Sequence, residues 1–444
     1  MPEVQKWKPS FFNVTLDRNE RRLIFNSSTT KMIDLDRPQA ELLEDSLEQI
    51  GRSGQCANES LLQCLISLGF VVPEEENEYE RERIRFQTTK ASRETLRVTI
   101  APTMACNLRC SYCFQQNLVR GKSMKPDVQQ GVIDFIQRKL EEGSKRLVVQ
   151  WFGGEPLLAF KQIVAMSAEF QSICTERGIA YYSEMLTNGT LLSAEMIDGF
   201  RRIALKAIQI PMDGTVGTYA RRKNVSVERA NGFHRFLIGH LQSLVDVTGS
   251  VTIRINVDRD NPEGGKDVVR MFKDQGVVDP RIDFRLGFLN TSRGLVECIP
   301  HDCFSPAQFS NVEVEFMHFL ASEGYRVYGS PSKRNFPCAA PLSHSYTIDP
   351  EGRIGKCVPA IGTEESIFSR IYPHDIKRTL LETSLPEAPY GKFDPFSSGV
   401  CEDCKLLPVC LGSCPKMHEP GRTAMCSMKE GLLDRLRFHD SHPD

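Results

Sequence analysis

The chain has 444 residues, with 55 lysines and arginines against 57 aspartates and glutamates, so its formal net charge is −2. This balance favours neither nucleic acid nor an anionic membrane as a partner, and a chain of this length is expected to form two or three domains. No apolar run approaches the roughly 18 residues of a membrane span, and the N-terminus lacks the apolar region of a secretory signal, so we expect a cytoplasmic protein.

Residues 1–73 are predicted to form a small α+β domain. Three short runs that contain apolar residues are separated by polar turns, which is typical of a small antiparallel sheet. Two longer segments with apolar residues at helical spacing follow them and predict two helices. The strand-like runs are 11–17, 21–28 and 31–36, and the helical segments are 37–50 and 58–70.

The next stretch, residues 74–95, is highly charged and almost devoid of apolar residues. Such a composition is typical of a linker or of a solvated helix. We therefore expect it to separate the first domain from the rest of the chain.

Over residues 96–300, strand-like and helical runs alternate. Repeated βα units predict parallel strands joined by right-handed crossovers. About six units fit before residue 290, too few for a closed eight-unit barrel, so the predicted fold class is α/β with a partial (β/α)6 TIM-like barrel. The strand-like runs are 95–102, 146–156, 180–190, 205–214, 251–261 and 281–290, and the helical runs are 125–140, 158–174, 193–203, 228–242 and 263–275.

Residues 301–444 lose this alternation and are predicted to form a cysteine-rich domain. Residues 345–357 predict a β-hairpin with its turn at Asp349–Gly352. Residues 427–439 predict a helix near the end of the chain.

Cysteine is the residue type that most needs an explanation, because cytoplasmic thiols are kept reduced and disulfide frameworks suit small secreted domains. Ten of the 15 cysteines fall into two groups, at 106–113 and over 338–426. Metal or iron–sulfur ligation explains these groups better than disulfides do. Cys56, Cys64 and Cys174 are most simply small apolar residues on helical faces.

The first group, in the sequence MACNLRCSYCFQQ, forms a C-x3-C-x2-C array of Cys106, Cys110 and Cys113 directly after the first predicted barrel strand. Barrels of this class place their chemistry at the C-terminal ends of the strands. Three thiolates can hold three irons of a [4Fe–4S] cluster and leave the fourth iron open to another ligand. A zinc site that borrows a distant fourth cysteine is the alternative.

Polar residues also follow the next three predicted strands, as a ligand-binding barrel mouth requires. The second strand ends in GGEP, where glycines allow close backbone approach and a carboxylate can accept a hydrogen bond from an ammonium group. The third strand ends in LTNGT and the fourth in IPMDG.

This combination resembles the radical S-adenosylmethionine (SAM) enzymes over roughly residues 96–290. The resemblance implies that the open iron of the cluster is chelated by the amino and carboxylate groups of S-adenosyl-L-methionine. One electron from the cluster then cleaves SAM to methionine and a 5′-deoxyadenosyl radical, which abstracts a hydrogen atom from the substrate.

The resemblance also implies a set of SAM-binding residues, which are Tyr112, Gly153, Gly154, Glu155, Thr187, Asn188, Arg222 and Asn256. Glu155 would meet the SAM amino group, and the backbone around Tyr112 would meet the adenine. Thr187 and Asn188 would lie near the ribose or the methionine moiety. Arg222 would lie near the carboxylate, with an ordinary surface arginine as the alternative.

Two features of the later strands bear on this site. Pro211 stands where relatives often have a serine, so a hydroxyl contact to SAM is missing. Arg254, Asn256 and Asp258 share one face of the fifth strand by alternation. That face either lines the cavity or forms half of a buried polar network.

The second cysteine group has the pattern C-x13-G-x4-C, then C-x2-C-x5-C-x3-C, then a last cysteine, and it resembles the SPASM domain of radical SAM enzymes. The matching residues are Cys338, Cys357, Cys401, Cys404, Cys410, Cys414 and Cys426. The resemblance implies two auxiliary clusters, so the chain would hold three [4Fe–4S] clusters in all. Two zinc knuckles are the alternative.

By this resemblance the ligands of the outer auxiliary cluster are Cys401, Cys404, Cys410 and Cys426, and those of the inner one are Cys338, Cys357 and Cys414. The inner cluster is then one protein ligand short. Either Cys303 or Cys298 reaches it, or one iron is open to a substrate group such as a peptide thiolate, which is a soft ligand.

Enzymes with both domains mostly modify peptides or proteins. The N-terminal unit resembles the winged-helix-like element that binds leader peptides as an added edge strand in pathways to ribosomally made, post-translationally modified peptides (RiPPs). A structural cap on the barrel is the alternative. We therefore expect a maturase that cross-links a carbon of a precursor peptide to sulfur, oxygen or another carbon, with a thioether slightly favoured. Its expected partners are the precursor with its leader and an electron donor such as a flavodoxin or a ferredoxin.

The alternative function is an anaerobic sulfatase-type maturase, which oxidises a cysteine or serine to formylglycine. Those relatives usually place an aspartate directly after the second SPASM cysteine, whereas here Cys357 is followed by Val358. A non-catalytic iron–sulfur or zinc interaction protein is the second alternative, and it would need neither GGEP nor a barrel mouth. The sequence does not identify the general base.

Overall fold

The computed structural model describes residues 5–18, 20–113, 115, 121–289, 303–327, 332, 333, 335–383, 389–399, 401–418, 431 and 433–436. The chain divides into two compact units, each of which is described by itself. Unit 1 draws on residues 1–90, 329–338 and 393–444, and unit 2 on residues 91–328 and 339–392.

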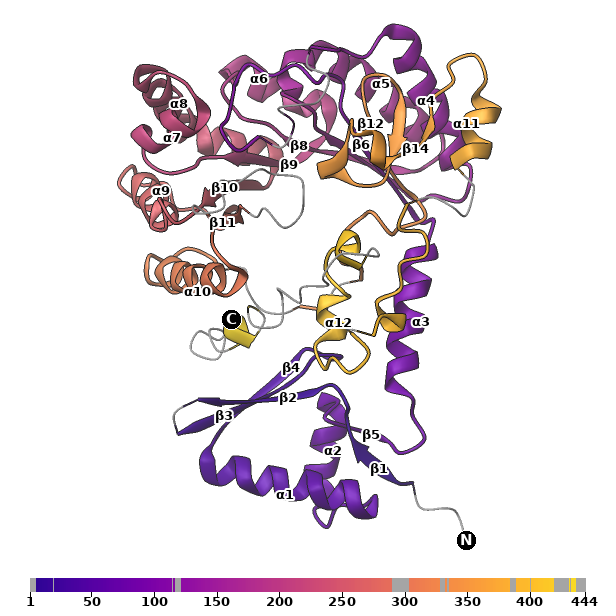
Figure 1. Cartoon of the computed structure of the whole chain (residues 1–444), viewed down its shortest axis with the longest axis vertical. Helices are drawn as coiled ribbons and strands as arrows, with labels where there is room; N and C mark the ends of the chain where they lie inside the picture. Colours follow the sequence, from indigo (N-terminus) through magenta and orange to yellow (C-terminus); the bar gives the residue numbers. More distant parts are fainter. Residues whose placement is uncertain are drawn as a thin grey trace. The chain divides into compact units, whose positions relative to one another are not determined.

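Unit 2 is built on a sheet whose first six strands are parallel and lie next to one another in chain order (Figure 1). The strands are β6 (Thr95–Ile100), β7 (Arg146–Trp151), β8 (Ala180–Leu186), β9 (Leu205–Pro211), β10 (Val251–Val257) and β11 (Ile282–Phe288). The six predicted strands are therefore confirmed. An α/β sheet with six parallel strands in this order is consistent with a partial TIM-like barrel.

Helices connect these strands or follow the last of them, and they cover one face of the sheet, as right-handed βα units require. They are α4 (Pro126–Leu140), α5 (Phe160–Glu176), α6 (Ala194–Gly199), α7 (Val216–Lys223), α8 (Val227–Thr248), α9 (Gly264–Lys273) and α10 (Pro306–Ser322). The ends of α8 follow from local chemistry: the Ser226 side chain accepts from Arg229 N, and Gly249 ends the helix at φ 76°. Helix α7 was not predicted from the sequence.

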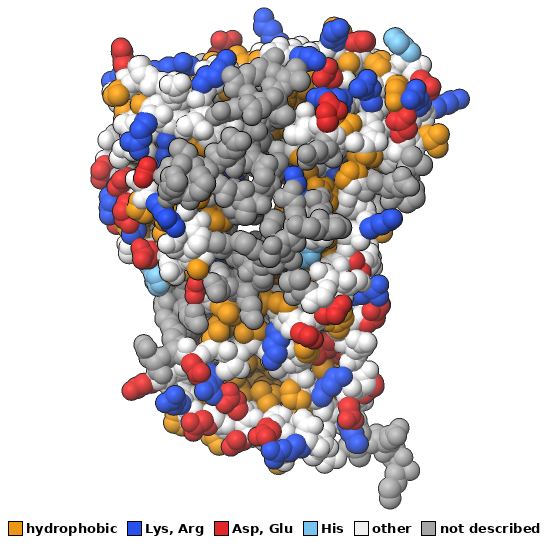
Figure 2. Space-filling view, viewed as in Figure 1, with side chains coloured by type: hydrophobic (Ala, Val, Ile, Leu, Met, Phe, Trp, Pro, Cys, Tyr) orange, Lys and Arg blue, Asp and Glu red, His pale blue; other side chains and the backbone are white. Residues whose placement is uncertain are grey.

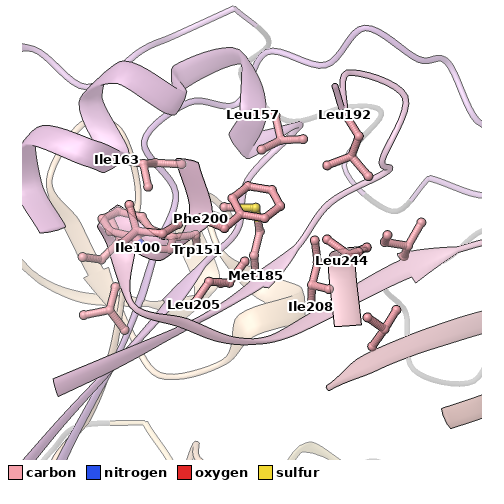
Figure 3. Close-up of a cluster of buried hydrophobic side chains, with 14 of the residues drawn as sticks. Ile100, Trp151, Leu157, Ile163, Met185, Leu192, Phe200, Leu205, Ile208 and Leu244 are labelled. Carbon is pink, nitrogen blue, oxygen red and sulfur yellow. The ribbon is translucent and has the colours of Figure 1, made fainter. Parts of the chain in front are cut away.

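Buried apolar side chains fill the space between the helices and this face of the sheet (Figure 3). Ile100, Trp151 and Met185 come from successive strands, and they lie in one cluster with Ile163 of α5 and Phe200. Each of these residues is at most 1% exposed. Full burial of one such side chain stabilises the folded state by about 1.5–3 kcal/mol, so this cluster holds the ends of the strands together.

The opposite face of the sheet, which we call the inner face, carries polar residues. Thr99 of β6 donates to Gln150 of β7 at 3.3 Å, and Gln150 donates to Glu184 of β8 at 3.4 Å. Strands of a parallel sheet that is packed on both faces usually read as continuous apolar runs. Alternation of apolar and polar residues therefore indicates that the inner face contacts water or a polar ligand.

Three further strands extend the sheet beyond β6. They are β12 (Ser345–Ile348), β13 (Arg353–Gly355) and β14 (Ile367–Arg370), with α11 (Ile376–Thr383) after them. Strand β12 runs parallel to β6, and β12 and β13 form the predicted hairpin. Gly352 in its turn has φ 75°, a conformation that favours glycine.

Unit 1 contains the predicted three-stranded antiparallel sheet, in the order β2-β3-β4. Its elements up to residue 91 are β1 (Trp7–Pro9), β2 (Asn13–Arg18), β3 (Arg21–Asn26), β4 (Lys31–Asp36), α1 (Arg37–Ser53), α2 (Glu59–Leu68), β5 (Val71–Pro73) and α3 (Glu78–Ala91). Strand β1 pairs with β5. The charged stretch therefore contains a helix, α3, whose residues Glu78, Glu82 and Phe86 are buried.

The sheet of unit 1 is packed on both faces. Leu43 and Leu62 of α1 and α2 pack on one face, beside Ile24. On the other face, Leu23 and Phe25 pack against the cysteine-rich segment that contains α12 (Leu407–Cys410). The predicted helix at 427–439 lies mostly outside the described residues. Among the described residues, no helix combines the length and the apolar character that a membrane crossing needs.

Candidate functional site

The cysteine loop follows the C-terminal end of β6 and borders a cavity of about 240 Å³ in unit 2. Cys106, Cys110 and Cys113 all line this cavity and are present as thiols. The full lining is Met104, Ala105, Cys106, Leu108, Arg109, Cys110, Cys113, Gln115, Gly121 and Gly154. The structure thus brings the three predicted cysteines together with one of the two GGEP glycines.

The chemistry of this donor set fits an iron–sulfur cluster, because all three side chains are thiols. Within the parts of the chain that the structure describes, no three His, Cys, Asp or Glu side chains converge closely enough to hold one metal ion. An iron–sulfur cluster has several irons, each of which takes its own cysteine, so its ligands surround a cavity without meeting at a point. Three cysteines line one cavity here, which is the arrangement that three ligands of a cluster need.

Burial favours the neutral thiol form of Cys106 and Cys110. Desolvation raises the pKa of Cys110 to about 11 and also raises the pKa of Cys106. Metal ligation requires the thiolate, so a bound cation must displace these protons. The loop is therefore suited to a strongly thiophilic metal group.

The two glycines of GGEP place the end of β7 directly against the cysteine loop. Gly154 N donates to Thr103 O at 3.1 Å, and Glu155 N donates to Ala105 O at 2.8 Å. A Cβ on Gly153 would lie 2.2 Å from Thr103 O, and one on Gly154 would lie 2.3 Å from Ala105 O. The predicted reason for the glycines, close backbone approach, is confirmed.

Gly154→Ala should therefore displace the cysteine loop. The new Cβ would meet backbone atoms, which cannot rotate away, so we expect a loss of about 1–3 kcal/mol in unfolding free energy and a lower metal content. Gly217→Ala is the matched control, because nothing lies within 4 Å of a Cβ at that helical position. Urea unfolding and metal analysis measure both effects, and equal behaviour of the two variants would contradict the expectation.

Glu155 is fully buried and binds two other predicted site residues, Thr187 and Asn188. Thr187 Oγ1 donates to Glu155 Oε1 at 2.6 Å, and Asn188 N donates to Oε2 at 2.7 Å. Leu157 N also donates to Oε1, at 3.0 Å. Carboxylate oxygens accept two hydrogen bonds each, so Oε2 has capacity for one more donor, such as an ammonium group.

Burial raises the pKa of Glu155 to about 7 from its ordinary value of 4.5, although its three donors oppose the shift. Between these values the native chain holds a proton that the unfolded chain has released, so the free energy of unfolding falls as pH rises from about 4.5 to about 7. The wild-type chain should lose roughly 3 kcal/mol relative to Glu155→Gln across this window. Urea unfolding at several pH values tests this, and parallel curves for both chains would contradict it.

Asn188 ties the third strand end to the cysteine loop. Its Nδ2 donates to Asn107 Oδ1 at 2.9 Å and lies 3.8 Å from Cys106 Sγ. Asn107 Nδ2 in turn donates to Thr190 Oγ1 at 2.9 Å. The TNGT segment therefore lies beside the first cysteine, as a shared binding site requires.

The other predicted SAM-binding side chains have protein partners. Arg222 is 5% exposed, donates to Asn256 O at 2.6 Å and pairs with Asp258. The Tyr112 hydroxyl and the Asn256 amide both bind Asp213. Asn256 and Asp258 therefore take part in a polar network with Arg222 and Asp213, one of the two alternatives that the alternation allowed.

Sequence reasoning missed Asp213 and Lys223, which form a buried ion pair beside Tyr112. Asp213 stood in the IPMDG motif without a role of its own, and Lys223 followed Arg222 in a basic run. A run of charges usually lies in solvent, so no sequence signal distinguished the buried lysine from its neighbours.

The cysteines of the second group lie in both units. Four are in unit 1 around α12, and all four are partly exposed; they are Cys401, Cys404, Cys410 and Cys414. Cys338 also belongs to unit 1, whereas Cys357 follows the hairpin in unit 2. Cys426 and Cys298 lie outside the described residues, and Cys303 is buried.

Comparison with known proteins gives a family match over the barrel. Residues 100–231 match the Radical SAM superfamily. The radical SAM cyclopropyl synthase TigE of Paramaledivibacter caminithermalis is 23% identical over 32% of this chain, a match that spans only 33% of TigE. A cysteine-type anaerobic sulfatase-maturating enzyme of Clostridium novyi is 20% identical over 74% of this chain and 90% of that protein.

Two solved structures show the same fold. The anSMEcpe structure with bound AdoMet and the Cp18Cys peptide has a TM-score of 0.58 and 16% identity, covering 78% of this chain and 97% of that one. The structure of Streptococcus suis SuiB bound to its precursor peptide SuiA has a TM-score of 0.54 and 14% identity, covering 95% of this chain and 100% of that one.

Proposed function

Because residues 100–231 make this chain an enzyme of the radical SAM superfamily, we propose that it oxidatively modifies a ribosomally made precursor peptide. The modification is a cross-link from a peptide carbon to sulfur, oxygen or another carbon, and a thioether is the bond that we favour. The observation that carries this proposal is the cavity with three cysteines, held against the GGEP and TNGT segments at the edge of a polar inner face.

Cys106, Cys110 and Cys113 are proposed to hold a [4Fe–4S] cluster with SAM on its open iron. When bound, the reduced cluster would supply one electron, which would split SAM into methionine and a 5′-deoxyadenosyl radical able to take a hydrogen atom from the substrate. Glu155 is proposed to accept a hydrogen bond from the SAM ammonium through Oε2. Thr187 and Asn188 hold that carboxylate in place, and the backbone around Tyr112 receives the adenine.

The inner face is proposed to receive the peptide. Charged and amide groups are present there, on Arg254, Gln150 and Glu184. Gln150 and Glu184 precede the GGEP and TNGT segments on strands β7 and β8, and Arg254 is on β10. A peptide offers backbone and side-chain hydrogen-bonding groups that match such a surface. Support comes also from anSMEcpe and SuiB, both of which have been solved with a peptide bound.

Cross-linking a carbon to a thiol removes two hydrogen atoms from the peptide. The first leaves as the abstracted hydrogen atom, so one proton and one electron must also leave. We propose that the seven cysteines of the second group hold two auxiliary clusters that accept this electron. A flavodoxin or a ferredoxin is the proposed donor of the electron that starts each cycle.

The N-terminal sheet is proposed to bind the leader of the precursor. Strands β2 and β4 are its edge strands, and an edge strand offers unpaired backbone groups to an added strand. Both faces of the sheet are packed, so its edges are the surfaces at which a strand can add.

Formylglycine formation is the second candidate, favoured by the match to the Clostridium novyi enzyme over 90% of its length. In this chain Val358 follows Cys357 and begins a short 3-10 helix, Val358–Ala360, so this position has no carboxylate. That absence weighs against the second candidate.

The proposal is tested by incubating the anaerobic, reduced enzyme with SAM and synthetic precursor peptides that carry a leader. We expect 5′-deoxyadenosine and a peptide that has lost the mass of two hydrogen atoms. Removing the leader should abolish the mass change. Conversion of a short sulfatase-derived peptide to formylglycine, with no reaction on leader-bearing peptides, would support the second candidate instead.

A further inference from the structure

Four polar residues from four separate segments meet at the cysteine loop, and we call them the loop clasp; three of them are buried and Tyr112 is half-buried. They are Tyr112 of the loop, Asp213 after β9, Lys223 at the end of α7 and Asn256 of β10. Lys223 Nζ lies 2.7 Å from Asp213 Oδ2, and Asn256 Nδ2 donates to Asp213 Oδ1 at 2.9 Å. The Tyr112 hydroxyl donates to Asp213 and accepts from Lys223.

The ion pair at the centre of the clasp is fully buried, with Asp213 0% and Lys223 1% exposed. Burial works against both charges, yet the pair holds the pKa of Asp213 below its usual value and that of Lys223 above it. Replacing a buried ion pair by packed apolar residues is often neutral or stabilising. Stability of the fold is therefore a weak reason for charges at this position, whereas both charged groups bind the Tyr112 hydroxyl.

Two consecutive residues of the cysteine loop, Ser111 and Tyr112, form hydrogen bonds with the end of α7. Ser111 N donates to Arg222 O at 2.9 Å, and the next residue, Tyr112, binds Lys223, the residue after Arg222. Lys223 Nζ also lies 4.9 Å from the centre of the Tyr112 ring. Two consecutive loop residues are thereby paired with two consecutive residues of α7.

Tyr112 is well placed to control the ligands, because it lies between Cys110 and Cys113. Cys113 N donates to Cys110 O at 3.2 Å, so these residues form one tight turn with Tyr112 inside it. A side chain that is fixed at its hydroxyl restricts the turn and both cysteines with it. Ordering this turn in advance removes an entropic cost that metal binding would otherwise bear.

We propose that Tyr112, Asp213, Lys223 and Asn256 position the cysteine loop for its metal cofactor, with the Tyr112 hydroxyl as the link. These are positioning residues, since they act through the cysteines. The inference rests on the proposed role of the loop as cluster ligand, but its first measurement uses neither SAM nor a substrate.

The test is Tyr112→Phe in the full-length chain as purified, with its metal loaded. Hydrogen exchange of residues 104–113 should become roughly tenfold faster, since a hydrogen bond to a charged group is lost. Metal loss to a chelator should accelerate by a similar factor, and the electron paramagnetic resonance spectrum of the reduced protein should change. Tyr219→Phe is the control. Tyr219 is buried on α7, its ring centre lies 5.6 Å from Lys223 Nζ, and its hydroxyl has no hydrogen-bond partner among the described residues.

A second variant removes the charges together. Asp213→Asn with Lys223→Met leaves no lone buried charge, so it should fold and yet show the same faster exchange over residues 104–113. Exchange and metal loss that match the Tyr219→Phe control in both variants would overturn the proposal. If the wild-type chain fails to cleave SAM while the exchange difference persists, the proposed function fails and the positioning role stands.

Discussion

Alanine in place of Cys110 is expected to abolish reductive cleavage of SAM, with a loss of at least ~1,000-fold in 5′-deoxyadenosine formation. The cavity offers three cysteines, and a cluster held by two of them loses an iron site or fails to assemble. The assay is the release of 5′-deoxyadenosine from SAM by the anaerobic enzyme with a strong chemical reductant, which needs no peptide.

Cys64→Ala is the matched control, since Cys64 is an exposed cysteine on α2 in unit 1. It should cleave SAM at the wild-type rate and keep its full iron content. Cys110→Ala should lose about four irons per chain, the content of one cluster. Wild-type 5′-deoxyadenosine formation by the Cys110 variant would refute the assignment of the loop.

The second large effect is expected from Cys401→Ala, which should reduce peptide cross-linking by at least ~100-fold and leave SAM cleavage within a few-fold of wild type. The reason is the electron balance, because the product needs an acceptor for one electron and SAM cleavage does not. Cys401 is a better choice than Cys404 or Cys410, which pack against the apolar core below the N-terminal sheet. Product is measured as peptide mass, and cleavage as 5′-deoxyadenosine.

Retained SAM cleavage would show that unit 2, which contains the cysteine loop, is still folded in the variant. The iron content should fall from about twelve to about eight per chain, and Cys64→Ala should again behave as wild type. Full cross-linking by Cys401→Ala would exclude the auxiliary clusters as electron acceptors. Loss of both reactions would instead indicate that the substitution unfolds the chain.

Much of the barrel could be predicted because its signal is local. Leu96, Val98 and Ile100 alternate with polar residues along β6, and this period of two defines a strand with one buried face. Helix α8 has a serine cap at its start and a glycine at its end, and each acts within one turn. Such patterns depend only on residues that are close in sequence, so they can be recognised without knowledge of the tertiary structure.

Elements that depend on distant partners could not be predicted in this way. Strand β12 reads as one half of a hairpin, yet Ser345 pairs with Arg97 of the barrel sheet. Helix α3 reads as a charged linker or a solvated helix, yet Glu82 is buried and accepts hydrogen bonds from Ser28 and Arg85. In both cases the neighbour that decides the structure is far away in the chain.

The candidate site divides in the same way. Sequence by itself determined which reactive groups are available: the spacing of Cys106, Cys110 and Cys113, and the glycines beside Glu155, place soft ligands and a carboxylate at strand ends. Only the tertiary structure decided how these groups are held, through Thr187 at Glu155 and Lys223 at Tyr112. Spacing is a property of adjacent residues, whereas the partner of a buried charge depends on how strands and helices pack, because desolvation makes a buried charge without a partner too costly.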